Sequence, residues 1–202
     1  MIQIDDSYQM IQNKKLERSE RVGEWCKSKL NPVKNQFKQN FVNLEIGCGH
    51  GHWLSSFALD CDSEVFIGID LITKRVEKAK LKCDKRFQQN ILFLKAEASE
   101  FLESSNLSIS KTFIMYPDPW PKSKHHKRRL IQGAFLDLLA SKTIHNGLLY
   151  FMTDHEPYFK WSLLKIEQSS NWNIVDLAWP HNAFSYFSDL LPERMFFCAK
   201  VT

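Results

Sequence analysis

The sequence predicts an α/β protein built on a doubly wound, mostly parallel sheet. Two observations carry this prediction: short apolar runs rich in Val, Ile, Leu and Phe recur from residue 41 onward, and charged stretches of helical character separate them. Runs without clean alternation are typical of strands buried on both faces, and alternating strands and helices imply right-handed crossovers. The runs are FVNLEIG, EVFIGID, ILFLKAE, TFIMYPD and LLYFMTD.

The segments between and after these runs agree with that fold class. Apolar residues at 130, 131, 134, 135, 138 and 139 fall on one stripe of an amphipathic helix, which Gly147 would end before LLYFMTD. NIVDLAW and ERMFFCAKVT have no obvious long helix between them, so the last strand is expected to be antiparallel. Doubly wound sheets bind ligands beyond the carboxyl ends of their strands, and we expect the site there.

Length and composition bound the domain organisation. With 202 residues, 44% of them hydrophobic, we expect one domain over residues 41–202, preceded by a polar, partly helical segment over residues 1–40. No apolar run approaches the roughly 20 residues that span a bilayer, and the first residues lack the apolar core of a signal peptide. This predicts a soluble, cytoplasmic protein without membrane contact, and leaves both monomer and homodimer open. The five cysteines show no C-x-x-C spacing and are expected to be reduced.

Positive charge is concentrated in one part of the chain. Five Lys or Arg residues and no Asp or Glu lie between residues 119 and 136. Because the total is +4, the rest of the chain has a formal charge of about −1. Such a patch is an electrostatic footprint for a polyanion, although a basic cluster without other signals is more simply a solvated helix start.

A stiff loop, YPDPWP, directly precedes this patch. Pro117, Pro119 and Pro121 fix φ and remove backbone donors, so the segment is neither helix interior nor central strand. Asp118 lies between two of these prolines at the end of a predicted strand, where scaffolds usually carry their chemistry. Trp120 is expected either to stack on a base or to pack against the loop.

Three glycines follow the first predicted strand, in LEIGCGHGHW. Gly47, Gly49 and Gly51 supply a tight turn and let a ligand approach the backbone. The dinucleotide fingerprint requires a glycine where His52 lies, which disfavours a nicotinamide cofactor. Glu45, just before the first glycine, would repel a pyrophosphate and attract an ammonium.

S-adenosylmethionine (SAM), which carries an amino-acid ammonium, a sulfonium and a ribose, fits these residues better. Asp70 ends the second predicted strand, where a carboxylate can accept hydrogen bonds from a ribose diol. Glu97, after the third strand, could accept from an adenine amino group. Each carboxylate alone is more simply a solvated strand end, but together with the glycine loop they indicate a SAM site.

No metal site is predicted. Cys48, His50 and His52 lie close together in the sequence, but a tetrahedral site needs a second cluster, for which His125 and His126 are the sole candidates. His50 and His52 are more simply a loop residue and a helix-start residue.

The chain contains four elements that resemble, in order and spacing, those of the bacterial TrmB-type tRNA (guanine-N7)-methyltransferases. They are LEIGCGHG, FIGID, PDPWPKSKHHKRRL and TDHEPY. The most specific part is P-D-P-W followed by K-x-x-H-x-K-R-R. The resemblance implies a seven-stranded SAM-dependent methyltransferase fold that methylates N7 of the variable-loop guanosine, position 46, of tRNA. Asp118 would be the active-site residue. The resemblance and the glycine loop together predict SAM contacts at Glu45, Gly47, Gly49, Gly51, Asp70, Glu97 and Asp118, and substrate or RNA contacts at Lys122, Lys124, His125, His126, Lys127, Arg128, Arg129, Asp154 and Glu193.

Four positions depart from the family pattern, and two other functions stay open. Asp70 lies where the family often has Glu, Glu97 where it often has Asp, and His155 where it usually has Trp; the segment ending at Glu193 lacks the family's Thr. One alternative is a SAM-dependent enzyme acting on an exocyclic amine of another base, because P-D-P-W resembles the D/N-P-P-Y/F/W loop of such enzymes. The other is a non-catalytic RNA-binding module.

Overall fold

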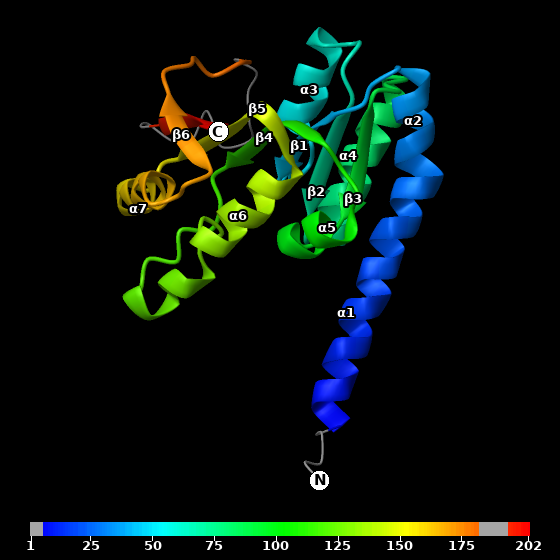
Figure 1. The fold of residues 1–202 in the computed structure, drawn as a ribbon. Coiled ribbons are helices and arrows are strands. Elements are labelled where there is room, and N and C mark those ends of the chain that lie inside the picture. Colours follow the sequence, from blue (N-terminus) through cyan, green and yellow to red (C-terminus); the bar gives the residue numbers. More distant parts are fainter. Residues whose placement is uncertain (1–5, 182–193) are drawn as a thin grey trace.

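In a computed structural model that describes residues 6–181 and 194–202, seven strands form one sheet in the order β3-β2-β1-β4-β5-β7-β6 (Figure 1). β1 to β5 run parallel, and β7 is antiparallel to both β5 and β6. The doubly wound sheet with an antiparallel last strand is therefore confirmed. The strands are β1 (Val42–Ile46), β2 (Phe66–Asp70), β3 (Ile91–Lys95), β4 (Ile109–Met115), β5 (Thr143–Thr153), β6 (Trp172–Val175) and β7 (Met195–Val201).

Helices cover both faces of the sheet. Those on one face are α3 (His52–Asp60) and α4 (Thr73–Lys85). The other face is covered by α5 (Ala98–Ser104), α6 (Gly133–Lys142) and α7 (Glu156–Glu167). Every residue of β1 and β2 is buried, as expected for strands enclosed between two helical layers. None of the described helices combines the length and the apolar composition that crossing a membrane requires.

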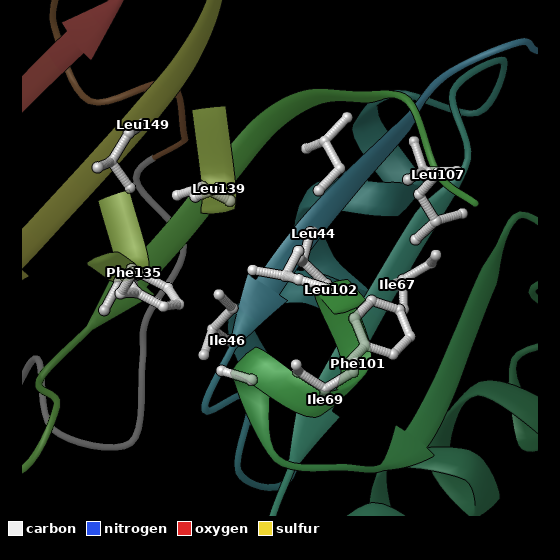
Figure 2. Close-up of a cluster of buried hydrophobic side chains, with 14 of the residues drawn as sticks. Leu44, Ile46, Ile67, Ile69, Phe101, Leu102, Leu107, Phe135, Leu139 and Leu149 are labelled. Atoms are coloured by element: carbon white, nitrogen blue, oxygen red, sulfur yellow. The ribbon is translucent and has the colours of Figure 1, made fainter. Parts of the chain in front are cut away.

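The larger apolar core lies between the sheet and the α5 and α6 layer (Figure 2). Leu44 of β1 and Ile67 of β2 are side by side in the parallel register, and both are fully buried. They meet Phe101 of α5 in the same cluster. Each such side chain contributes roughly 1.5–3 kcal/mol by leaving water, so this core holds the strand ends at fixed positions.

The N-terminal segment is more helical than its composition predicts. α1 (Asp6–Trp25) spans 20 residues and continues through a π-helical turn, Cys26–Leu30, into α2 (Asn31–Gln36). Arg18 of α1 donates to Glu100 of α5 at 2.6 and 2.9 Å, which ties the second half of α1 to the domain. The first turns of α1 project past the rest of the chain (Figure 1). The segment contributes Val22, Cys26 and Leu30 to the core.

The helix predicted from the stripe at 130–139 begins later than expected. α6 starts at Gly133, so Leu130 and Ile131 precede it. Residues 123–128 form a separate 3-10 helix, η2 (Ser123–Arg128). Ile131 is nevertheless fully buried, because the extended chain directs it into the core from outside the helix.

The expectation that Gly147 ends this helix is wrong. α6 ends at Lys142, and Gly147 lies inside β5. The pairing of β5 with β4 is irregular here, and Asn146 takes a φ of 62°. A bulge of this kind absorbs extra residues without ending the strand, which a linear reading of apolar runs does not detect.

Candidate active site

The glycine loop follows β1 with its backbone in the left-handed region. Gly47, Gly49 and Gly51 have φ values of 80°, 54° and 64°, which residues with a Cβ rarely adopt. A Cβ built on Gly47 or Gly49 would have no described heavy atom within 4 Å, whereas one on Gly51 would meet the ring of Phe93. The loop therefore leaves open space against its first two glycines and packs closely at the third.

Glu45 is a buried carboxyl next to that loop. Its side chain is 3% exposed, and its Oε2 has no hydrogen-bond partner among the described residues. Burial, and secondarily the charge of Asp70, raises the pKa of Glu45 to about 8. A buried acceptor without a partner is rare in folded proteins, and it is satisfied when a ligand brings a donor.

Asp70 anchors the glycine loop from the end of β2. Its Oδ2 accepts from the amide of Gly49 at 3.0 Å, and its Oδ1 accepts from the amide of Ile72 at 2.8 Å. Arg75 lies 3.8 Å from Oδ2. Each carboxylate oxygen can accept a further hydrogen bond, so Asp70 can shape the loop and bind a hydroxyl at once.

Glu97 has a structural role that the sequence did not reveal. It is the N-cap of α5, and its Oε2 accepts from the amide of Glu100 at 2.9 Å. Capping by a side-chain acceptor satisfies one of the free amides of the first turn. Glu97 thus lies at the carboxyl end of β3, as expected, with one oxygen committed to the helix.

The P-D-P-W loop begins where β4 ends. The amide of Tyr116 donates to the carbonyl of Met152 at 2.8 Å, and Asp118 is exposed two residues later. Burial raises the pKa of Tyr158 in α7 to about 12, and the charge of Asp118 acts weakly in the same direction. Tyr116 and Trp120 have φ values of 50° and 43°, a conformation that persists in non-glycine residues only where the surroundings enforce it.

Trp120 packs within its own loop in this structure. Its ring lies edge-on to His125, with 5.7 Å between centroids, and the guanidinium carbon of Arg128 lies 5.0 Å from the Trp120 centroid. The side chain is half-buried, so part of it stays accessible to a base.

The basic segment displays its exposed cations on η2 and on Lys122, the residue before it. Lys122, Lys124, Lys127 and Arg128 are exposed, as a phosphate-binding surface requires. His125 and His126 are half-buried, and the Nε2 of His126 lies 3.4 Å from the carbonyl of Pro121.

Arg129 lies elsewhere than expected. We predicted that it would touch RNA with its neighbours, but it is only 3% exposed. Its Nε donates to the carbonyl of Pro119 at 2.8 Å, and its guanidinium packs over the rings of Tyr158 and Trp161. A planar, weakly hydrated guanidinium stacks readily on aromatic faces, and the fold brings two such faces of α7 alongside Arg129.

Of the remaining predicted substrate residues, Asp154 lies within the described part of the chain and Glu193 does not. Asp154 is exposed directly after β5, at the same edge of the sheet. His155 caps α7, since its Nδ1 accepts from the amide of Tyr158 at 3.1 Å, which gives the departure from the family's Trp a local function. Glu193, with the segment Leu190-Leu191-Pro192 before it, lies outside the described residues.

His50 and His52 lie in the loop and at the first position of α3, as expected, with ring centroids 6.0 Å apart. Burial, with nearby Lys side chains, lowers the pKa of both. Within the described ranges no three His, Cys, Asp or Glu residues come together as metal ligands would.

Sequence reasoning missed Tyr158 and Trp161 of α7. Both lie under the basic segment, where the Tyr158 hydroxyl accepts from the amide of Ile131 at 3.2 Å and the Trp161 indole donates to the Ile131 carbonyl at 3.0 Å. Tyr158 ends the T-D-H-E-P-Y element, so its place in that motif was the signal that could have marked it.

Solved structures share the fold. An antibiotic-related methyltransferase matches with a TM-score of 0.59 at 18% sequence identity, covering 86% of this chain and 92% of that one. TrmN from Thermus thermophilus matches with a TM-score of 0.59 at 13% identity, covering 85% of this chain and 48% of that one. The fold is therefore the Rossmann-like fold of methyltransferases.

Sequence comparison identifies the family. Residues 39–188 match the family model Methyltransf_4, described as "Putative methyltransferase", and the chain belongs to this family, the TrmB family that its motifs resemble. It is 34% identical to the tRNA (guanine-N(7)-)-methyltransferase of Wolbachia pipientis, over 66% of this chain and 61% of the relative. It is 36% identical to that of Mycoplasma genitalium, over 67% of this chain and 66% of the relative. The chain thus spans somewhat less than two thirds of the length of the curated relatives it matches.

Proposed function

We propose that this chain is a SAM-dependent tRNA (guanine-N7)-methyltransferase. The observation that carries the proposal is the buried carboxyl of Glu45, whose Oε2 lacks a partner within the described chain beside an open glycine loop. The α-ammonium of SAM would supply the missing donor and a compensating charge. The names of the curated relatives support the choice of tRNA and of guanine N7.

The donor set fits this cofactor, which when bound supplies a methyl group activated by a sulfonium. Gly47 and Gly49 admit a ligand against the backbone, and Gly51 closes the turn. Asp70 has lone pairs left for the ribose diol. Glu97 is proposed to meet the adenine amino group through the oxygen that does not cap α5, and Asp118 to border the cofactor from the β4 loop.

The reaction needs positioning more than acid or base chemistry. N7 of guanine carries an in-plane lone pair, so no proton has to leave before it attacks the methyl group, and the product is a cationic base. Asp118 is proposed to accept from N1 and N2 of the purine, which orients N7, and to offset the positive charge that develops on the ring. Its exposure leaves both oxygens available to an incoming base.

The tRNA would be held by the side chains that surround this loop. Charged groups on η2 meet phosphates, which position the RNA and carry little sequence information. Asp154 lies at the same edge and is proposed to meet the substrate directly. The proposed RNA contacts are Lys122, Lys124, His125, His126, Lys127 and Arg128, with Glu193 kept as an expectation from the sequence.

Nucleoside mass spectrometry tests this proposal. Unmodified tRNA incubated with the protein and SAM should yield 7-methylguanosine, and a transcript with the variable-loop guanosine replaced by adenosine should yield none. Formation of N6-methyladenosine instead would establish the exocyclic-amine alternative. Absence of product together with absence of SAM binding by calorimetry would favour the RNA-binding module.

A further inference from the structure

Arg129, the last cation of the basic segment, forms a hydrogen bond with the loop that precedes the segment. Arg129 Nε donates to the carbonyl of Pro119, ten positions earlier in the chain. The contact closes residues 119–129 into a loop, with Lys122, Lys124 and Arg128 on its exposed side. The bonded carbonyl belongs to the peptide unit between Pro119 and Trp120, and Pro119 directly follows Asp118.

Two aromatic rings of α7 pack against the guanidinium of Arg129. Its central carbon lies 5.0 Å from the centroid of Tyr158 and 5.2 Å from that of Trp161. Both rings are held in turn by Ile131, the second residue after Arg129, through hydrogen bonds to its amide and its carbonyl. Arg129 therefore has little freedom to leave, and Nη2 is buried without a partner inside the described ranges.

The loop needs such a restraint. Trp120 has a φ of 43°, which a non-glycine residue keeps only where neighbouring contacts outweigh the strain. Prolines on both sides of Asp118 remove amides that could otherwise have bonded to the protein. The hydrogen bond from Arg129 acts on the peptide unit that leads into the strained residue.

We propose that Arg129 is a positioning residue, which holds the peptide between Pro119 and Trp120 in place so that the carboxylate of the preceding Asp118 meets the guanine, and that it is not a phosphate ligand. The inference rests on the proposed function, since it names a residue for that reaction. Lysine cannot replace Arg129, because an ammonium on a flexible stem lacks the planar fork that stacks on both rings while donating sideways.

The test is Arg129→Lys, with the exposed Arg86→Lys as a matched control. In methyl transfer from labelled SAM to tRNA, we expect kcat to fall about ten- to a hundredfold, as for a small displacement of a reacting group, while KM for tRNA and its salt dependence stay within about twofold. Arg86→Lys should change none of these. Normal kcat with a raised KM and a flatter salt dependence would show that Arg129 binds phosphate and would overturn the proposal.

Hydrogen exchange gives a readout that needs neither cofactor nor RNA. The amide of His125 bonds to the carbonyl of Lys122 at 2.8 Å inside the loop. In Arg129→Lys it should exchange at least about tenfold faster while the core strands keep their protection. Unchanged exchange, or a lowered melting temperature with normal kcat, would reduce Arg129 to a packing residue.

A second variant covers the case in which Arg129→Lys fails to fold. Trp161→Leu leaves Arg129 and its hydrogen bond in place but removes one ring of its platform, and should show the same pattern with a smaller loss of kcat. Unaltered kcat and exchange would contradict the proposal. If the wild-type protein methylates no tRNA, the proposed function fails, whereas the exchange experiment still decides whether Arg129 restrains the loop.

Discussion

Glu45 and Asp118 are two carboxylates of the candidate site, and they lie in opposite surroundings. Glu45 is buried inside β1, where burial raises its pKa to about 8, and Asp118 is exposed on a proline-rich loop beyond β4. A buried carboxyl binds a cation strongly because water does not compete, but it destabilises the empty protein once it ionises. An exposed carboxylate does not destabilise the protein when it ionises. Its position relative to a ligand depends on how rigidly its backbone is held.

The same contrast extends to the groups around them. The glycine loop is held by a hydrogen bond from the amide of Gly49 to Asp70, whose other oxygen accepts from the amide of Ile72 beyond β2. The P-D-P-W loop is held by its prolines and by one hydrogen bond from the buried Arg129. In the proposed function, the cofactor side would therefore be specific through burial, and the substrate side through the rigidity of an exposed loop.

Replacing Asp118 should have the largest effect. Asp118→Ala removes the group proposed to orient the base and offset its charge, so the single-turnover rate should fall about 10²–10³-fold while the Kd for tRNA changes less than about twofold. Rapid-quench methyl transfer and filter binding measure the two quantities. Asp84→Ala, at an exposed position of α4, should leave both unchanged. Loss of affinity with normal chemistry would assign Asp118 to RNA binding instead.

Glu45→Gln tests the buried half of the comparison. Gln keeps the shape but cannot carry the charge that offsets an ammonium, so the affinity for SAM should fall about 10- to 100-fold, as for the loss of a charged hydrogen bond. Titration calorimetry measures this, with the exposed Glu77→Gln as control. Equal affinity in the two variants would place the ammonium elsewhere.

The same variant should alter the dependence of stability on pH. Because the pKa of Glu45 is about 8 in the folded protein and near 4.5 when unfolded, the folded state keeps a proton that the unfolded state loses between about pH 5 and 8. Wild-type stability from this group therefore falls as pH rises through that window, and Glu45→Gln lacks the fall. In urea unfolding at pH 8.5 the variant should be more stable than wild type by on the order of 3 kcal/mol, and the difference should shrink towards pH 5. Parallel curves would contradict the buried, protonated state.

The exposed cations of η2 should determine how steeply the affinity for tRNA falls as the salt concentration rises. Replacing Lys127 and Arg128 with alanine should lower the slope of log K against log salt by about 0.7–0.9 for each lost phosphate contact. Lys74 and Lys80, exposed on α4, form the matched pair and should leave the slope unchanged. A reduced slope for the α4 pair and not for the η2 pair would move the RNA to the other face of the sheet.

The smallest effect is expected at Glu97. Glu97→Ala should lower stability by about 1 kcal/mol through loss of the α5 cap, whereas Glu97→Ser should retain most of it, since Ser is a good N-cap. Both should weaken SAM binding about fivefold if the second oxygen meets adenine. Thermal unfolding and calorimetry separate the two roles, and unaltered SAM affinity in both variants would leave Glu97 as a cap alone.

The order of elements and the candidate site were predictable where the signal is local. Buried parallel strands require continuous apolar runs, a left-handed loop requires glycine, and a proline-fixed loop followed by cations is visible as such. The bulge in β5 and the packing of α1 on α5 were not predictable, because both involve residues far along the chain.

The sequence by itself determined the fold class, the glycine loop and the order of chemical groups along the rim, since each depends on side-chain type and spacing. Only the tertiary structure decided which groups are buried. Arg128 and Arg129 are chemically identical neighbours, yet one is exposed and the other lies on Tyr158 and Trp161, about thirty positions away along the chain. Burial is set by the side chains that the fold brings alongside, and on it rests our proposal that Arg128 binds RNA whereas Arg129 holds the site in place.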